Sequence, residues 1–374
     1  MTLPILRTTA LLLSISATLL SAEEKPVPPK PAPRTPTAAD VPYGPHPHQI
    51  LDIYVPPDSK EPCPVLLWYG GLWQPSKHAV DLGRFFPSHI AVVAVESRTL
   101  TDGMQEKANP PISYPMNDAC RAVQFIRLNA AKWNLDPQRI AVGGGSQGTL
   151  PALYVGCSGE HADANSKDPV EQTSSRVVCV AAYRSQPTID PKRMQEWVPG
   201  VAWGAPAFGV AFEESLKRRQ ELLPFIQKWS PDWLLNKDAA PIYFENEWGL
   251  TQPADFTEAN YKVHSPAWGL GFHKLAESVG ATVYNKYPRS PHREVQGHLG
   301  LHRAEPHGTS EVARAEVAES PTFRIAICAG LQIFLPANHA AFQLSALAGA
   351  FFAAGAFFCR GSNSKVTLGP SSLR

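Results

Sequence analysis

Ser146 has the neighbours that a catalytic nucleophile needs. The run Gly144-Gly145-Ser146-Gln147-Gly148 has the form G-x-S-x-G, with an apolar, β-branched stretch before it and a helix-compatible stretch after it. This order predicts a strand, a sharp turn that exposes the serine hydroxyl, and then a helix. The glycines leave the space that such a turn requires. The pattern indicates nucleophilic chemistry at Ser146, and a structural serine in a glycine-rich turn is the alternative.

A serine hydroxyl becomes a good nucleophile only when a base takes its proton, so a histidine must lie nearby in the fold. His292 is the preferred candidate, because it follows a predicted strand late in the chain, as the order Ser, acid, His requires. His298, His302 and His307 follow in the same stretch, and spacing alone leaves them open.

An acidic residue should orient the imidazole, and we expect it after the predicted strand at 240–244. Asp255 is the preferred candidate there. Glu245, Glu247 and Glu258 lie in the same stretch and remain alternatives.

Backbone amides should receive the negative charge that develops on the substrate carbonyl. One is expected from Gln147, directly after the nucleophile. The other should come from Gly70, Gly71 or Leu72, because this run follows an earlier buried strand and its glycines permit close approach to a substrate. A plain tight turn is the alternative interpretation.

Hydrophobic patterning predicts the elements that would position these residues. Runs of apolar and β-branched residues predict strands at 49–55, 64–69, 91–95, 139–142, 177–183, 240–244 and 281–287. Helical spacing of apolar residues predicts helices at 117–133, 213–229 and 273–279. The alternation predicts an α/β fold with a mainly parallel central sheet and helices on both faces.

Aromatic residues are dense between Asp190 and Leu235, where they predict a small cap. They could line a pocket over Ser146 or simply pack the cap onto the sheet.

The chain resembles secreted esterase and lipase members of the α/β-hydrolase superfamily, of the carbohydrate or feruloyl esterase type. The segments that carry the resemblance are 51–58, 69–77, 114–115, 117–119, 136–140, 144–148 and 287–292. The last of these resembles the catalytic-histidine loop of the family and so favours His292. The resemblance covers roughly 41–299, and it implies ester hydrolysis, with acylated polysaccharide or a short-chain aliphatic ester as the substrate.

Three departures from the family pattern stand out. Tyr69 replaces the usual histidine of the oxyanion loop, and Leu72 replaces its third glycine. The usual acid segment is absent. Some seventy residues follow the histidine loop, where one helix would be expected to end the domain.

The chain is expected to have four parts: a signal peptide at 1–22, a Pro-rich linker at 23–40, the hydrolase domain at 41–302 and an atypical tail at 303–374. The signal predicts a secreted or periplasmic protein. The tail includes an uncharged apolar stretch at 340–359. We favour a tail unrelated to the family; a membrane anchor and a packed apolar hairpin are the alternatives.

Composition and residue spacing argue against several classes of function. A formal net charge of +1 without a basic block does not indicate nucleic-acid binding. The six cysteines have no C-x-x-C spacing, and Cys157 with Cys179 is the first pair to test for a disulfide. Histidines and carboxylates show no ligand spacing, so no metal and no organic cofactor is expected.

Together these features predict a serine hydrolase that cleaves carboxylic esters through an acyl-enzyme. A peptidase on the same fold is one alternative. A catalytically silent, hydrolase-like binding protein is another, because of the altered oxyanion loop and the missing acid segment.

Overall fold

The computed structural model describes residues 34–77, 82–201 and 205–288. The chain divides into a unit of residues 1–35 and a unit of residues 36–374, and every described helix and strand lies in the second. The expected signal peptide and the tail at 303–374, with its apolar stretch at 340–359, lie outside the described residues. Among the described residues, no helix has the length and apolar character needed to cross a bilayer.

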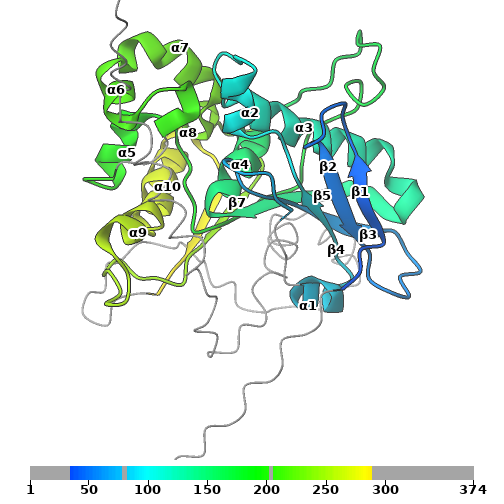
Figure 1. Cartoon of the computed structure of the whole chain (residues 1–374). Helices are drawn as coiled ribbons and strands as arrows, with labels where there is room; N and C mark the ends of the chain where they lie inside the picture. The colour runs from blue at the N-terminus through cyan, green and yellow to red at the C-terminus, as the bar shows by residue number, and fades with distance from the viewer. Residues whose placement is uncertain (1–33, 78–81, 202–204, 289–374) are drawn as a thin grey trace, which may run out of the picture. The chain divides into compact units, whose positions relative to one another are not determined.

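An eight-stranded sheet organises the described part of the chain (Figure 1). Its strands are β1 (Ala38–Pro42), β2 (Ile50–Tyr54), β3 (Cys63–Tyr69), β4 (Ala91–Val95), β5 (Leu135–Gly145), β6 (Val180–Tyr183), β7 (Ile242–Glu245) and β8 (Val283–Lys286). The spatial order is β1-β2-β4-β3-β5-β6-β7-β8. Only the pairings of β1 with β2 and of β2 with β4 are antiparallel. The expected mainly parallel α/β-hydrolase sheet is therefore confirmed.

The two faces of the sheet belong to different apolar clusters, because successive side chains of a strand point to opposite sides. On β3, Val65 and Leu67 join the larger cluster, whereas Leu66 joins the smaller one. Helices α3 (Ser113–Leu128), α4 (Thr149–Ser158) and α10 (Ala267–Val279) contribute to the larger cluster. Helix α1 (Leu82–Phe85) contributes to the smaller one.

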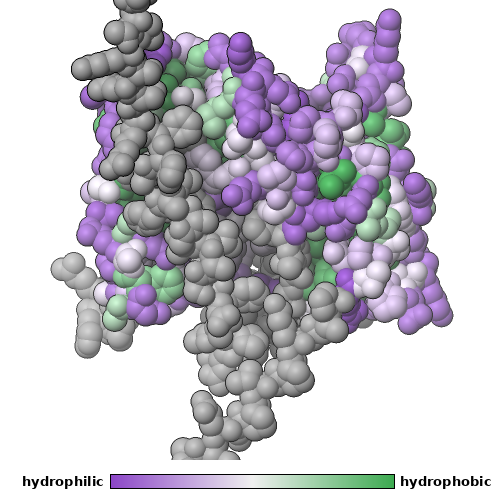
Figure 2. All heavy atoms as spheres, in the orientation of Figure 1, coloured by the Kyte–Doolittle hydropathy of each residue, from purple (hydrophilic) through white to green (hydrophobic). Residues whose placement is uncertain are grey.

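The remaining helical elements lie in the connections. They are η1 (Phe86–Ser88), α2 (Leu100–Gln105), η2 (Ala130–Trp133), η3 (Ser146–Gly148), α5 (Pro191–Trp197), η4 (Ala205–Phe208), α6 (Phe212–Lys217), α7 (Arg219–Trp229), α8 (Pro231–Leu234) and α9 (Glu258–Val263). Figure 2 shows mostly hydrophilic side chains on the described part of one face, with apolar ones scattered among them.

The structure corrects several predicted boundaries. Strand β1 begins at Ala38, inside the stretch assigned to the linker. The helix expected at 213–229 is two helices, α6 and α7, which meet at Arg218. Helix α10 starts six residues before the predicted helix at 273–279.

The connection between β6 and β7 carries the aromatic residues that predicted a cap. Trp229 and Phe212 are buried, and Trp197, Phe208 and Phe225 pack against the larger cluster. These five side chains therefore form apolar packing, which is the second of the two expected roles.

Buried ion pairs fix the same connection. Asp190 accepts two hydrogen bonds of 2.7 Å from Arg219, and Asp232 accepts one of 2.7 Å from Arg193. Both carboxylates have side chains with no exposed surface. Such pairing is what makes buried carboxylates tolerable in a folded protein.

The structure excludes the cysteine pair that was the first to be tested. Cys157 is a free, buried thiol, as are Cys63 and Cys120. Cys157 is therefore not bonded to Cys179.

Candidate active site

Ser146 stands at the carboxyl end of β5, on the sharp turn that the sequence predicts. Its φ is 52°, a left-handed conformation that is uncommon for a residue with a side chain. A Cβ atom on Gly144 would lie well under 3.0 Å from the Gly148 backbone, and one on Gly148 would meet the Tyr69 carbonyl equally closely. The two glycines therefore permit the turn that lifts the Ser146 hydroxyl.

His264 provides the imidazole that faces Ser146. Its Nε2 atom lies 2.8 Å from Ser146 Oγ, across 118 residues of sequence. Its Nδ1 atom lies 3.1 Å from both the backbone carbonyl oxygen and the side-chain oxygen of Asn260. Both of these atoms are acceptors, so Nδ1 carries the proton and Nε2 is left to accept the hydroxyl proton of Ser146.

The surroundings of His264 favour its neutral form. Burial, together with the positive charge of Arg184, lowers the pKa of His264 to about 4. The Arg184 guanidinium lies 4.4 Å from the centre of the Trp248 ring, and that ring packs edge-on against His264 at 5.9 Å. His264 is therefore neutral, and able to act as a base, throughout the physiological pH range.

Hydrogen bonds to the backbone hold the His264 loop in place. Asn246, at the end of β7, donates a side-chain hydrogen bond of 2.7 Å to the His264 carbonyl. Gln186, after β6, donates one of 2.9 Å to the Val263 carbonyl. The loop that presents the imidazole is thus tied to the ends of two neighbouring strands.

His264 was not predicted from the sequence. The base was expected after the strand at 281–287, and His292, His298, His302 and His307 all lie outside the described residues, so their roles stay predictions. His264 instead lies between β7 and β8, in the stretch where only the acid was expected. One sequence signal could have indicated His264. It directly precedes Ser265-Pro266, a pattern typical of a helix start, and thus lies in a loop that leads into a helix.

Among the described residues, none of the four acidic candidates is hydrogen-bonded to the His264 imidazole. Asp255 is exposed, between β7 and α9. Glu247 pairs with Arg184, Glu258 pairs with Lys262 at 2.6 Å, and Glu245 lies 3.2 Å from Arg84. Within the described ranges, His264 Nδ1 has Asn260 as its partner rather than a carboxylate. The predicted pairing of Asp255 with His292 remains a prediction.

The structure divides the expected oxyanion residues into two groups. The Gly70 amide donates to the Val95 carbonyl at 3.2 Å, so it belongs to the sheet and is not available to a substrate. The Gly71 amide donates to Ser76 Oγ at 3.3 Å, and the Leu72 amide donates to Gln147 Oε1 at 2.9 Å. The loop is therefore hydrogen-bonded to the side chain of Gln147, the residue after Ser146, and this side chain occupies the Leu72 amide.

The two departures in this loop have structural reasons. Tyr69 is 2% exposed, and its hydroxyl donates to the Ala119 carbonyl at 2.8 Å, which ties β3 to α3. Leu72 is 1% exposed, and its carbonyl accepts the Leu100 amide at 2.8 Å, which ties the loop to α2. Both side chains thus serve packing.

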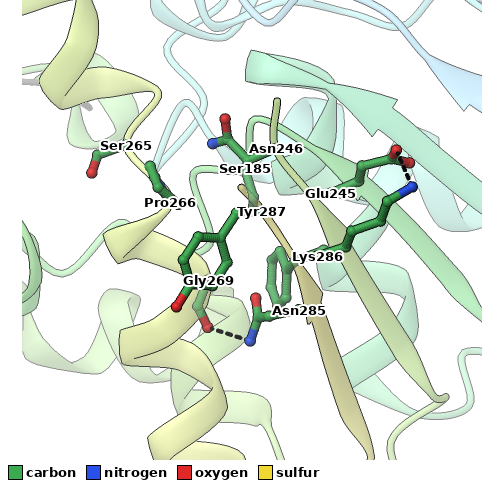
Figure 3. A pocket seen from close by; sticks show the side chains of 10 residues that line it. Ser185, Glu245, Asn246, Ser265, Pro266, Gly269, Asn285, Lys286 and Tyr287 are labelled. Atoms are coloured by element: carbon green, nitrogen blue, oxygen red, sulfur yellow. Dashed lines mark hydrogen bonds and ion pairs between the residues drawn. The ribbon is translucent and has the colours of Figure 1, made fainter. Parts of the chain in front are cut away.

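A small pocket lies next to the His264 loop (Figure 3). Asn246 and Lys286 line it from the ends of β7 and β8, and Ser265 and Gly269 line it from the segment after His264. The Ser185 hydroxyl, also in its lining, is buried without a hydrogen-bond partner among the described residues. Neither Ser146 nor His264 lines this pocket.

Comparison with known proteins adds a family match. Residues 51–243 match the family model BD-FAE. No curated protein matches the chain.

Solved structures also resemble the chain. A truncated carbohydrate esterase from gut microbiota is 18% identical over 67% of this chain and 87% of its own, with a TM-score of 0.49. An acetyl ester-xyloside bifunctional hydrolase from Caldicellulosiruptor lactoaceticus is 19% identical over 75% and 86%, with a TM-score of 0.45. A thermophilic esterase from Thermogutta terrifontis is 19% identical over 64% and 76%, with a TM-score of 0.41.

Proposed function

Because the chain belongs to the BD-FAE family of esterase-like α/β-hydrolases and is a carboxylic ester hydrolase, we propose that it works through an acyl-enzyme formed on Ser146. The observation that carries the proposal is the 2.8 Å contact between Ser146 Oγ and His264 Nε2. A serine at a strained turn, with a neutral imidazole in hydrogen-bond range, is the arrangement that activates a hydroxyl.

The proposed reaction has two steps. The Ser146 oxygen bonds to the ester carbonyl carbon while its proton passes to His264 Nε2. The bond to the leaving alcohol then breaks, and the imidazolium returns the proton to the alcohol oxygen. A water molecule then gives its proton to His264 Nε2 and bonds to the acyl carbon. The bond between that carbon and Ser146 Oγ breaks, and the imidazolium returns the proton to Ser146 Oγ as the carboxylic acid leaves.

Backbone amides and Asn260 have proposed roles in this reaction. The Gln147 amide is the first proposed donor to the oxyanion. A substrate would have to displace Ser76 Oγ to use the Gly71 amide, and Gln147 Oε1 to use the Leu72 amide. Asn260 replaces a carboxylate as the group that fixes the imidazole tautomer.

Labelling with a fluorophosphonate, followed by peptide mapping, tests the nucleophile. We expect one label per chain on Ser146, and Ser146→Ala should lower kcat by about a million-fold. Labelling of the well-folded protein at another residue, or retained ester cleavage by the Ser146→Ala variant, would refute the assignment.

Two single substitutions separate the competing bases. If His264 is the base, His264→Ala should lose labelling and turnover about as severely as Ser146→Ala, and His292→Ala should keep most of both. The reverse pattern would show that His292 is the base. Matched melting temperatures serve as the folding control for both variants.

A catalytically silent binding protein is the second candidate function. The observation that favours it is the Leu72 amide, which the protein's own Gln147 side chain occupies. The absence of labelling on Ser146 in a folded sample would support this alternative.

We further propose export of the protein and an acylated polysaccharide as its substrate, both on the sequence resemblance alone. A panel of acetylated and feruloylated polysaccharides beside short aliphatic esters tests the substrate. Cell fractionation with an antibody to the domain tests the location.

A further inference from the structure

A second cluster of chemically active side chains lies outside the Ser146 site. His46 and His48 belong to the connection between β1 and β2, and Asp102 lies in α2. One potential ligand atom from each of these residues lies within 4.8 Å of those of the other two. Glu106, one turn after Asp102, adds a fourth potential ligand, because its Oε1 atom lies 3.4 Å from His46 Nε2.

We propose that His46, His48 and Asp102 bind a divalent transition-metal ion, with Glu106 as a fourth ligand. Two imidazoles with carboxylates suit zinc and other divalent first-row transition metals, whereas calcium and magnesium need mainly oxygen ligands. The set has no recognisable spacing in the sequence, because the two histidines and the two carboxylates lie more than fifty residues apart in the chain.

The distances fit such an ion. Metal–ligand bonds of about 2.0–2.1 Å in a tetrahedral site place neighbouring ligand atoms about 3.3 Å apart. His48 Nδ1 lies 2.9 Å from Asp102 Oδ2, and His46 Nε2 lies 3.4 Å from Glu106 Oε1. Each of these pairs therefore already has close to the separation that two ligands of one ion would have.

The connection that carries the two histidines is rigidly held. Gln49 is 3% exposed, its side-chain oxygen accepts the His46 amide at 3.1 Å, and its side-chain amide donates to Asp118 at 2.7 Å. A site held in place before the ion arrives spends less free energy on ordering its ligands.

The carboxylates are also held in place. Asp102 forms a capping box with Thr99, and the Tyr114 hydroxyl donates to Glu106 Oε2 at 2.8 Å. The Tyr114 bond uses Glu106 Oε2 and leaves Oε1, the oxygen next to His46 Nε2, for an ion. Asp102 Oδ2, which accepts from Thr99 and also faces His48 Nδ1, would exchange its bond to His48 for the ion.

Two existing hydrogen bonds oppose ligation. The His48 amide donates to His46 Nδ1 at 3.1 Å, so Nε2 carries the proton of that ring, and ligation through Nε2 moves the proton to Nδ1 and breaks this bond. His48 Nδ1 donates to Asp102 Oδ2 at 2.9 Å, and ligation through Nδ1 replaces this bond with two bonds to the ion. The net stability of two such hydrogen bonds is small compared with the binding free energy of a structural zinc.

The expected role of the ion is structural. It would join the β1–β2 connection to α2, whose Leu100 amide bonds to the Leu72 carbonyl of the oxyanion loop. Binding to the folded chain alone stabilises that state by mass action.

Calorimetric titration of the full chain with Zn²⁺ tests the proposal. His46→Asn and His48→Asn should each weaken zinc binding at least tenfold. His89→Asn is the matched control, because His89 lies elsewhere with a φ of 54° that asparagine tolerates. This control should bind zinc as the wild type does, and zinc should raise the melting temperature of both proteins by a few degrees.

Two further measurements keep the test decisive. Glu106→Gln, which preserves the shape of the side chain, should weaken zinc binding several-fold even if a histidine variant fails to fold. Co²⁺ should give the visible absorption of a four-coordinate ion in the wild type. Equal zinc affinity in the wild type and in all the cluster variants, or weakening by His89→Asn to the same extent, would overturn the proposal.

Discussion

The pH profile of ester cleavage offers the sharpest test of His264 as the base. The imidazole must be neutral to accept the Ser146 proton, and the profile of kcat/KM reports the pKa of the free enzyme. Burial and Arg184 lower the pKa of His264 to about 4. Activity should therefore persist on acidification and fall only near pH 4, well below the ordinary histidine value of about 6.5.

Removing the charge of Arg184 should change the pKa of His264 in a known direction. Arg184→Asn removes the positive charge beside His264, so the pKa of the imidazole should rise. It should stay below 6.5, because burial is the larger cause and is unchanged. Asparagine suits the site, since Arg184 has a φ of 49°.

Glu247→Gln is the matched opposite change. Glu247 forms an ion pair with Arg184, so its neutralisation leaves the guanidinium charge uncompensated. The pKa of His264 should then fall further, and the acid limb should move to lower pH. The acid limb is measured for the wild type, Arg184→Asn and Glu247→Gln from initial rates on a neutral nitrophenyl ester between pH 3.5 and 8.

Two results would refute this reasoning. A wild-type acid limb at pH 6–7 would mean that a different histidine is the base. Shifts of Arg184→Asn and Glu247→Gln in the same direction would mean that the Arg184 charge does not act on the imidazole. Fluorophosphonate labelling at pH 8 controls for loss of the site itself.

Three further outcomes follow from the geometry. Gly148→Ala should abolish labelling and lower the melting temperature, because the new Cβ would collide with the Tyr69 carbonyl; unchanged labelling would contradict this. Gln147→Glu should lower kcat about a hundredfold in steady-state assays, because the new carboxylate would bind the Leu72 amide more strongly than the amide oxygen does, and its negative charge would repel the oxyanion. An unchanged kcat would count against this loop as the oxyanion site. In urea melts, the wild type should lose about 3 kcal/mol more stability than His264→Gln from pH 7 to pH 4, since unfolded histidine binds a proton that folded His264 does not; equal losses would contradict the low pKa of His264.

Much of the fold could be predicted because its central strands are apolar and β-branched. Strands β3, β4 and β7 are buried on both faces, so their sequences contain few polar residues and stand out. Strand β1 was missed because it is an edge strand, Ala-Ala-Asp-Val-Pro, with half-exposed or exposed side chains. Nothing in its composition separates it from the proline-rich stretch before it.

The turn that carries Ser146 could also be predicted, because it dictates a local sequence. Gly144 and Gly148 must lack side chains for steric reasons that involve only the turn and the adjacent β3. The position of His264, the proposed base, has no such local requirement. A loop of any sequence can present a histidine, and the contact of His264 with Ser146 depends on how that loop is tied to β6 and β7.

The electrostatics of the site explain how a base with so low a pKa can serve. Burial and Arg184 keep His264 unprotonated and ready, but they also disfavour the imidazolium that forms when Ser146 attacks. Asn260 offers oxygen dipoles to the imidazole instead of a full negative charge. The oxyanion that develops in the same step is itself a nearby negative charge, and in a buried site such a charge acts strongly on the imidazolium. The transition state would thus contain a positive imidazolium next to a negative oxyanion, whereas the resting site contains neither. Their attraction would therefore stabilise the transition state and not the ground state, which lowers the barrier.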